Sequence, residues 1–339
     1  MTPATARATP LLLVSVLSAC SMFGLTDEEQ ERLNFIKESA TLFYDTERYG
    51  RALEFVDRGL EIAPKDYKLR SIQAWCYLQQ VPERPEYLAV CEKLFDDLYE
   101  LRSPSDHGEP VLLGLGTTQT RLAQRHLDSA RVLEREIEEA KLPEHAVEMR
   151  RARVREHQDR ARHHLERAER AFDQMLASEM NPREAHRNLL EIAWARDDYE
   201  TAVEHGLRSL EYNLADQRNL SIRIDQTMDV GVEHELRLRL RRLVDDEIRT
   251  RSLMARMHSS NGDYAAALAH LDALLRIDPT RATDYYNRAW VHEQLGHVAE
   301  ARKDYGKFLM FPNRDLSDAK VKRAFEFTKL QPVEADHGH

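Results

Sequence analysis

The sequence predicts an all-α fold, an α-solenoid built from antiparallel helical hairpins. Charged residues make up 32% of the 339-residue chain and aromatic residues only 7%, with 12 glycines and 12 prolines. This composition favours long, solvated helices over a turn-rich β fold. Small and apolar residues also recur with a period of about 34 residues, the length of a two-helix repeat. Because the chain exceeds the size of one usual core, stacked repeats account for its length better than a single globule.

The first residues are typical of a secretion signal. Arg7 supplies a positive charge, and an apolar run from Leu11 to Ala19 follows that is too short to span a bilayer. The tetrapeptide Leu17-Ser18-Ala19-Cys20 resembles the lipobox of bacterial lipoproteins, whose cysteine becomes the lipidated first residue. An ordinary secretory signal that is cut elsewhere is the alternative.

The lipobox resemblance implies a signal peptide over 1–19, three acyl chains on Cys20 and a lipidated tether over 20–32. Buried acyl chains contribute about 0.8 kcal/mol per methylene, so such an anchor is effectively permanent. In Gram-negative lipoproteins an aspartate after the cysteine commonly retains the protein at the inner membrane. Ser21 stands there instead, which implies the periplasmic face of the outer membrane.

The first repeat is expected at 33–66. Ala40, Ala52 and Gly59 are spaced so that two antiparallel helices can cross closely at small side chains, and Pro64 ends the second helix because it lacks an amide donor. The pattern resembles a tetratricopeptide repeat. The same register returns in three further windows, at 183–216, 248–281 and 282–315.

Looser helical pairs complete an N-terminal repeat block over 33–142. Pro82 and Pro85 interrupt its middle. With Cys20 assigned to lipid, Cys76 and Cys91 remain as a pair in an oxidising compartment. Both fall on apolar helical positions, so the sequence leaves open a disulfide or two small buried hydrophobes.

Residues 143–182 depart from the repeat pattern. Val154, Ala161 and Ala168 belong to an apolar stripe that recurs every seven residues on a highly charged helix. Such a stripe needs a partner helix. The segment 120–140 is the nearest candidate, and we expect the two to form a long charged hairpin in the middle of the chain.

The C-terminal repeat block is expected over 183–330, followed by a disordered tail over 331–339. Its least regular part is 217–247, where apolar residues alternate with the period of a strand but also fit a helix. Helical neighbours on both sides favour helix, with a small β-hairpin as the alternative.

Catalytic and cofactor motifs are not found. The fifteen histidines show no metal-ligand spacing, and Gly114-Leu115-Gly116 lacks the remaining residues of a phosphate-binding loop. Arg237, Arg239, Arg241 and Arg242 suggest a polyanion patch, but acidic residues follow at once, and the formal net charge is -10. A solvated helix face is therefore favoured, and we expect no enzyme activity, metal, cofactor, small-molecule substrate or nucleic-acid partner.

In tetratricopeptide proteins the first helix of each repeat lines a concave groove at defined positions. Carried over to this chain, the resemblance implies these contact residues: Asn34, Lys37, Thr41, Tyr44, Glu184, Arg187, Glu191, Trp194, Arg249, Arg256, Thr283, Tyr286, Trp290 and Glu293. Aromatic residues beside arginine often anchor protein interfaces. The alternative for Trp194 and Trp290 is simple packing between adjacent repeats.

These resemblances together imply a non-catalytic scaffold at the outer membrane that binds other envelope proteins, as a peptide or a helix lying in its groove. It would help to assemble a cell-envelope complex. Two alternatives remain: a pilotin-like factor for type IV pilus or secretin biogenesis, and an envelope enzyme whose site is formed by residues distant in sequence.

Overall fold

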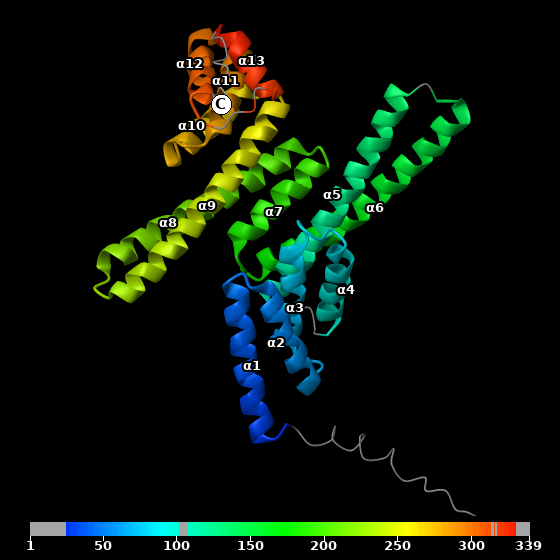
Figure 1. Ribbon diagram of the computed structural model, residues 1–339, viewed down its shortest axis with the longest axis vertical. Helices are drawn as coiled ribbons and strands as arrows, with labels where there is room; N and C mark the ends of the chain where they lie inside the picture. The colour runs from blue at the N-terminus through cyan, green and yellow to red at the C-terminus, as the bar shows by residue number, and fades with distance from the viewer. Residues whose placement is uncertain (1–24, 102–107, 141, 313–314, 316, 330–339) are drawn as a thin grey trace, which may run out of the picture. The chain divides into compact units, whose positions relative to one another are not determined.

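The protein is all-helical, as the sequence predicts (Figure 1). The computed structural model describes residues 25–101, 108–140, 142–312, 315 and 317–329, and in these ranges it contains thirteen α-helices and no strand. Cys20 and the tail over 331–339 lie outside the described residues. None of the described helices is both long and apolar enough to cross a membrane.

Two compact units divide the chain, one over 1–114 and one over 115–339. The sequence placed the end of the N-terminal block at 142 instead. The helix α5 (Glu109–Glu139) explains the difference, because it runs through the boundary without a break. Its first turns belong to the first unit, where the Trp75 indole donates to the Pro110 carbonyl (2.9 Å). The sequence shows only where a helix ends, not which neighbours each part of it contacts.

Four helices precede α5 in the first unit: α1 (Asp27–Asp45), α2 (Tyr49–Ile62), α3 (Tyr67–Gln80) and α4 (Tyr87–Glu100). The hairpin expected at 33–66 is present as α1 and α2, with Ala40 and Ala52 fully buried at the crossing. The helix begins six residues earlier than expected, inside the range 20–32 given to the tether. Thr26 and Glu29 form a capping box that starts it there.

Cys76 and Cys91 are both buried thiols and are not joined to each other. The Cys91 sulfur lies 3.9 Å from the Ala74 carbonyl oxygen, and burial raises the pKa of the Cys76 thiol to about 12. Of the two alternatives, the structure therefore has the pair of small buried hydrophobes and not the disulfide.

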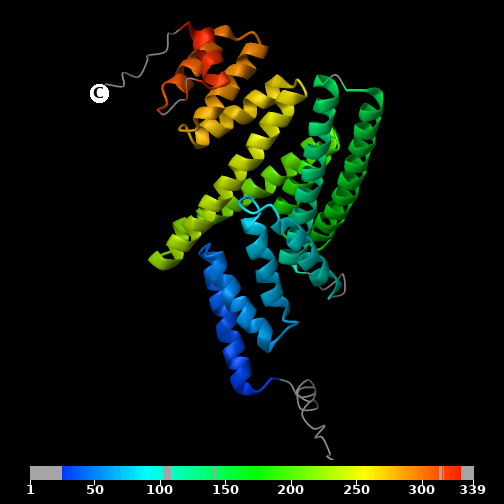
Figure 2. The same cartoon turned by 45° about the vertical axis from the view of Figure 1, so that its right-hand side comes forward.

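The long charged hairpin is present in the second unit as α5 and α6 (Glu144–Ala177), which lie side by side in both views (Figures 1 and 2). Leu133 and Ala130 of α5 pack on Val154 of α6, as the seven-residue stripe predicts. Near the base, the Phe172 ring covers Gly116, where an added Cβ would lie 2.4 Å from the ring. The glycine run is therefore a close helix contact.

The segment 217–247 is helical, so the expected helix is confirmed and the β-hairpin alternative is wrong. It forms the distal part of a second long hairpin, made by α8 (Tyr199–Gln226) and α9 (Val230–Ser260). Leu236 and Leu243 are buried seven residues apart, whereas Leu238 is exposed. The Asn213 amide of α8 donates to the Leu243 carbonyl of α9 (3.0 Å), which holds the two helices together.

Helix pairs stack in order through the rest of the second unit. The helices are α7 (Pro182–Ala195), α10 (Tyr264–Ile277), α11 (Ala282–Gln294), α12 (Val298–Leu309) and α13 (Ala319–Thr328). Each contacts its neighbours along the chain, and α13 packs on α12 at the C-terminal end of the stack. Gly262 and Gly296 make the turns after α9 and α11 with φ of 80° and 75°, a conformation that glycine adopts without strain.

Candidate functional site

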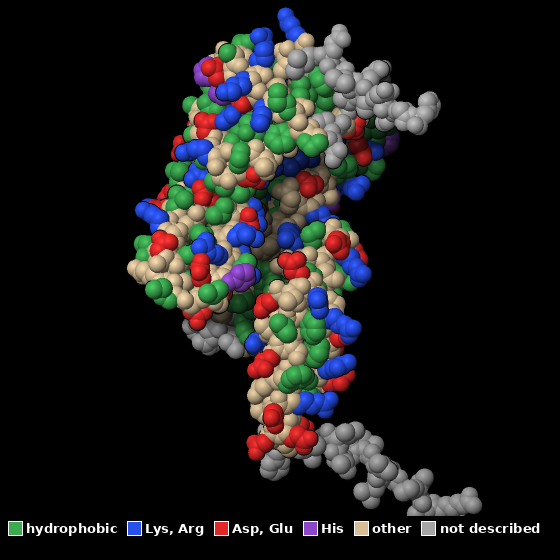
Figure 3. All heavy atoms as spheres, turned by 60° about the vertical axis from the view of Figure 1, so that its left-hand side comes forward, with side chains coloured by type: hydrophobic (Ala, Val, Ile, Leu, Met, Phe, Trp, Pro, Cys, Tyr) green, Lys and Arg blue, Asp and Glu red, His purple; other side chains and the backbone are tan. Residues whose placement is uncertain are grey.

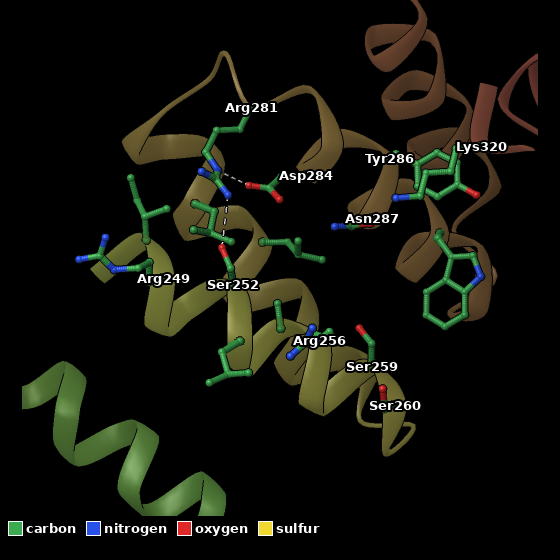
Figure 4. Close-up of a pocket in the computed structure, with 16 residues that line it drawn as sticks. Arg249, Ser252, Arg256, Ser259, Ser260, Arg281, Asp284, Tyr286, Asn287 and Lys320 are labelled. Atoms are coloured by element: carbon green, nitrogen blue, oxygen red, sulfur yellow. Dashed lines mark hydrogen bonds and ion pairs between the residues drawn. The ribbon is translucent and has the colours of Figure 1, made fainter. Parts of the chain in front are cut away.

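A groove of about 830 Å³ lies in the second unit between α9, α11 and α13 (Figure 4). On α9 its lining residues recur every three or four positions, at Arg249, Ser252, Arg256 and Ser259, so they share one face of the helix. We call this hollow the α9–α11 groove. Its polar and aromatic lining residues outside α9 are Arg281, Asp284, Tyr286, Asn287, Trp290 and Lys320.

One wall of the α9–α11 groove is fixed by an ion pair. The Arg281 guanidinium, just before α11, binds the buried Asp284 carboxylate and also donates to the Ser252 hydroxyl of α9 (3.3 Å; Figure 4). This contact joins the start of α11 to the C-terminal third of α9. The separation between the two helices is therefore set before any ligand arrives, which lowers the ordering cost of binding.

Aromatic rings form the other end of the groove. Trp290 meets Tyr264 edge-on, with ring centroids 5.7 Å apart, and the Lys320 ammonium lies 5.5 Å from the Tyr286 ring centroid. Trp290 is only partly buried in its core cluster. Trp290 therefore has both of the positions that the sequence left open, because it packs between helices and also lines the groove.

A second hollow of about 770 Å³ shares Arg249, Leu253 and Arg256 with the α9–α11 groove and extends toward α5 and α7. The Arg256 guanidinium lies 4.5 Å from the Trp194 ring centroid, a cation–π contact. Arg187 and Glu191 also line this hollow, and the Arg187 Nε is buried with no hydrogen-bond partner among the described residues.

The contact residues implied by the sequence are thus only partly brought together. Seven line the two hollows: Arg187, Glu191, Trp194, Arg249, Arg256, Tyr286 and Trp290. Glu184 instead pairs with Arg187, Thr283 is exposed outside the lining, and Glu293 accepts from Tyr305 (3.1 Å) and Arg323 (2.8 Å) inside the C-terminal packing.

The four residues of the first repeat lie on α1 in the other unit. Lys37 pairs with Asp66 (2.5 Å), and the Thr41 hydroxyl donates to the Lys37 carbonyl (2.7 Å). Asn34 accepts from Gln30 (3.1 Å), and the Tyr44 hydroxyl accepts from Gln79 (3.5 Å). All four side chains therefore make polar contacts within the first unit.

Sequence reasoning missed Ser252, Arg281, Asp284, Asn287 and Lys320. Ser252 follows Arg249 by three residues and precedes Arg256 by four, so helical spacing alone marks it. Lys320 had no such signal, because it reaches the groove from α13.

Comparisons with known proteins agree with this arrangement of helices. Residues 159–216 and residues 254–324 each match a family described as tetratricopeptide repeat. These two stretches are identified as tetratricopeptide repeats. The second stretch runs from the end of α9 into α13, so tetratricopeptide helices form most of the α9–α11 groove.

Solved structures give weaker likenesses. A tetratricopeptide repeat protein from Parabacteroides merdae is 13% identical, covering 88% of this chain and 99% of its own, with a TM-score of 0.39. The TPR2AB domain of yeast Sti1, solved in complex with pHSP90, is 12% identical, covering 88% and 98%, with a TM-score of 0.30. No curated protein matches the chain. At these scores no contact is transferred, and the site rests on this chain's own residues.

Helices α9 and α10 also bury a pair of stacked histidines. The rings of His258 and His270 lie 5.3 Å apart, and the His270 Nδ1 is buried with no hydrogen-bond partner among the described residues. Burial, with His258 and Arg251 nearby, lowers the pKa of His270 from its ordinary value of 6.5 to about 4. The Tyr199 hydroxyl (2.6 Å) and the Asp263 carboxylate (3.5 Å) face His258 from the other side.

Acid is therefore expected to destabilise the second unit. His270 binds a proton near pH 6.5 in the unfolded chain but only near pH 4 in the folded chain. Its contribution to the free energy of unfolding is therefore fully present above pH 6.5 and is lost as the pH falls from 6.5 to about 4. Between pH 7 and pH 5 this one group accounts for about 2 kcal/mol. Between pH 7 and pH 5, the free energy of unfolding measured in urea should therefore fall by about 2 kcal/mol less in His270→Leu than in the parent chain.

The exposed His145 of α6 provides the matched control. His145→Leu should keep the full pH dependence of the parent chain. An undiminished pH dependence in His270→Leu would show that this buried histidine does not contribute. The other histidines with a lowered pKa change stability in the same direction: His126, His186, His205, His258 and His292.

Proposed function

We propose that the chain is a non-catalytic scaffold that binds another protein through the α9–α11 groove. The groove lining carries this proposal. Arg249 and Arg256 of α9 line it together with Tyr286 and Trp290 of α11. Arginine and large aromatic residues are the side chains that most often dominate binding energy at protein interfaces.

The shape of the site supports a polypeptide ligand. The lining follows α9 from Ile248 to Ser260, which at 1.5 Å per residue is about 18 Å of helix. A peptide or one face of a helix can lie along such a length. Tetratricopeptide repeats are suited to this role, since stacked hairpins place the first helix of each repeat side by side.

The proposed location is the periplasmic face of the outer membrane. The lipobox-like Leu17-Ser18-Ala19-Cys20 and the serine that follows it support this part of the proposal. A lipid on Cys20 would hold the scaffold at the membrane, so the bound partner is proposed to be another envelope protein and the process to be assembly of an envelope complex.

Reversing two groove charges is expected to abolish partner capture. The affinity-tagged chain is used to recover proteins from detergent-solubilised membranes, and the recovered polypeptides are compared between variants. Arg256→Glu with Lys320→Glu places two carboxylates in the groove, and a loss of about 2 kcal/mol or more is typical when a central arginine is removed. That corresponds to at least about thirtyfold weaker binding.

The matched control reverses two exposed charges outside the groove, Arg276 on α10 and Lys303 on α12. Arg276→Glu with Lys303→Glu changes the net charge equally and should recover the same polypeptides as the parent. Equal recovery by the groove variant and the control, with both variants folded by circular dichroism, would contradict binding in the α9–α11 groove.

A further inference from the structure

Five arginines gather in a third hollow, about 670 Å³ in volume, where α7, α8 and α9 meet. They are Arg183, Arg223, Arg239, Arg242 and Arg249. Only two carboxylates, Asp216 and Asp246, line the same space. We call this hollow the arginine pocket; its Arg239 and Arg242 belong to the arginine run for which the sequence favours a solvated helix face over a polyanion patch.

Ion pairs neutralise only part of this charge. Asp246 pairs with both Arg183 and Arg249, and Arg239 pairs with Glu235 of the preceding turn. Arg223 and Arg242 are exposed and have no ion-pair partner within the described part of the chain. The pocket therefore presents uncompensated positive charge, and guanidinium groups bind carboxylates in strong, charge-assisted hydrogen bonds.

The arginine pocket adjoins the proposed binding groove. Arg249 lines the arginine pocket, the α9–α11 groove and the hollow beside α5, so all three open along one helix. From Arg239 to Ser259 this helix covers about 30 Å. An extended peptide of about nine residues spans that length.

Two hydrogen bonds join the helices of the hairpin at the pocket. Gln217 of α8 donates to Glu247 of α9 (2.7 Å), and Asn213 donates to the Leu243 carbonyl (3.0 Å). These contacts fix the two helices at the level of the pocket. Arg223 of α8 and Arg242 of α9 therefore project from helices that are already paired before a ligand binds.

We infer that the arginine pocket receives acidic side chains, so that the polypeptide bound in the α9–α11 groove carries a cluster of Asp or Glu residues. This inference rests on the proposed protein-binding function. A protein partner is favoured over nucleic acid or an anionic membrane because the chain has a formal net charge of -10. Basic and acidic side chains are also intermixed over the face drawn in Figure 3, where no broad basic surface is presented.

A synthetic, fluorescein-labelled peptide of ten glutamates tests the inference. Its affinity for the full chain is measured by fluorescence anisotropy in low salt. Arg223→Glu with Arg242→Glu is expected to weaken binding by about tenfold or more, since two attractive charges become repulsive. Arg241→Glu reverses the exposed arginine next to Arg242, outside the pocket lining, and should leave the affinity within about twofold.

Either of two results would overturn the inference: no measurable binding of the decaglutamate, or binding that is unaffected by the pocket variant. Stronger, pocket-dependent binding of phosphatidylglycerol vesicles or of a short DNA duplex would also overturn it, in favour of another anion. The proposed function has a separate readout in the groove variant Arg256→Glu with Lys320→Glu. Loss of partner capture there, without decaglutamate binding, would keep the groove and reject the acidic partner.

Discussion

Arg288→Ala is expected to lower the free energy of unfolding of the second unit by about 3–5 kcal/mol, the range for breaking a buried ion pair by removing one partner. The guanidinium of Arg288 binds both oxygens of Asp304 (2.6 and 2.8 Å) and one of Asp272 (2.8 Å). Asp304 is 4% exposed, so the substitution leaves a buried carboxylate without its cation. These hydrogen bonds also raise the pKa of Arg288 above its ordinary value.

Arg302→Ala is the matched control, because it removes an exposed arginine from α12 in the same repeat and should change stability by at most about 0.5 kcal/mol. Arg288→Lys should recover only part of the loss, since an ammonium cannot make the two parallel hydrogen bonds. Urea unfolding followed by circular dichroism measures all three. Equal stability of Arg288→Ala and Arg302→Ala would show that Asp304 finds water or another cation.

Phe172→Ala is expected to cost about 3–5 kcal/mol, the usual range for truncating a buried aromatic ring. Phe172 has no exposed surface, and its ring fills the space above Gly116 at the base of the α5–α6 hairpin. Gly116 has no side chain that could move into the gap left by the ring. The lost contacts therefore remain as a cavity.

Met149→Ala removes a large apolar side chain from the same helix, but Met149 is 61% exposed. Its effect should stay within about 0.5 kcal/mol of zero. Thermal and urea unfolding distinguish the two variants. A cost below about 1 kcal/mol for Phe172→Ala would mean that the hairpin base repacks, and the assigned role of Gly116 would be wrong.

Helix pairs were predictable from the sequence because small residues mark where two helices cross. Ala40, Ala52, Ala267 and Ala301 are all fully buried, each in the crossing register that the repeat length gives. The α5–α6 hairpin was predictable for a related reason. A seven-residue apolar stripe on a charged helix has to be covered by another helix.

The second long hairpin and the arginine pocket depend on how the helices stack. The spacing of apolar residues along the sequence does not show this. The alternation of Leu236 and Leu238 fits strand and helix alike, and only burial against α8 separates them. The extra length of α8 and α9 beyond a standard repeat had no sequence signal, so the second long hairpin was missed. The arginine pocket followed from that hairpin, since Arg223 and Arg242 are distant in sequence and meet only where the helices pair.

The groove residues were partly predictable. Arg249 and Arg256 came from the positional pattern of tetratricopeptide repeats, whereas the Arg281–Asp284 pair depends on the angle between α9 and α11. Glu293 accepts a hydrogen bond from Arg323 of α13, a contact that the positional pattern does not report.

Site-specific photo-crosslinking tests binding in the α9–α11 groove most directly. A benzophenone side chain is placed either at Asn287, which lines the groove on α11, or at Lys303, which is exposed on α12 of the same repeat. Irradiation of native membranes should give one discrete crosslinked polypeptide from Asn287, lost in the Arg256→Glu and Lys320→Glu background, and none from Lys303. The same polypeptide captured from Lys303 but not from Asn287 would contradict groove binding.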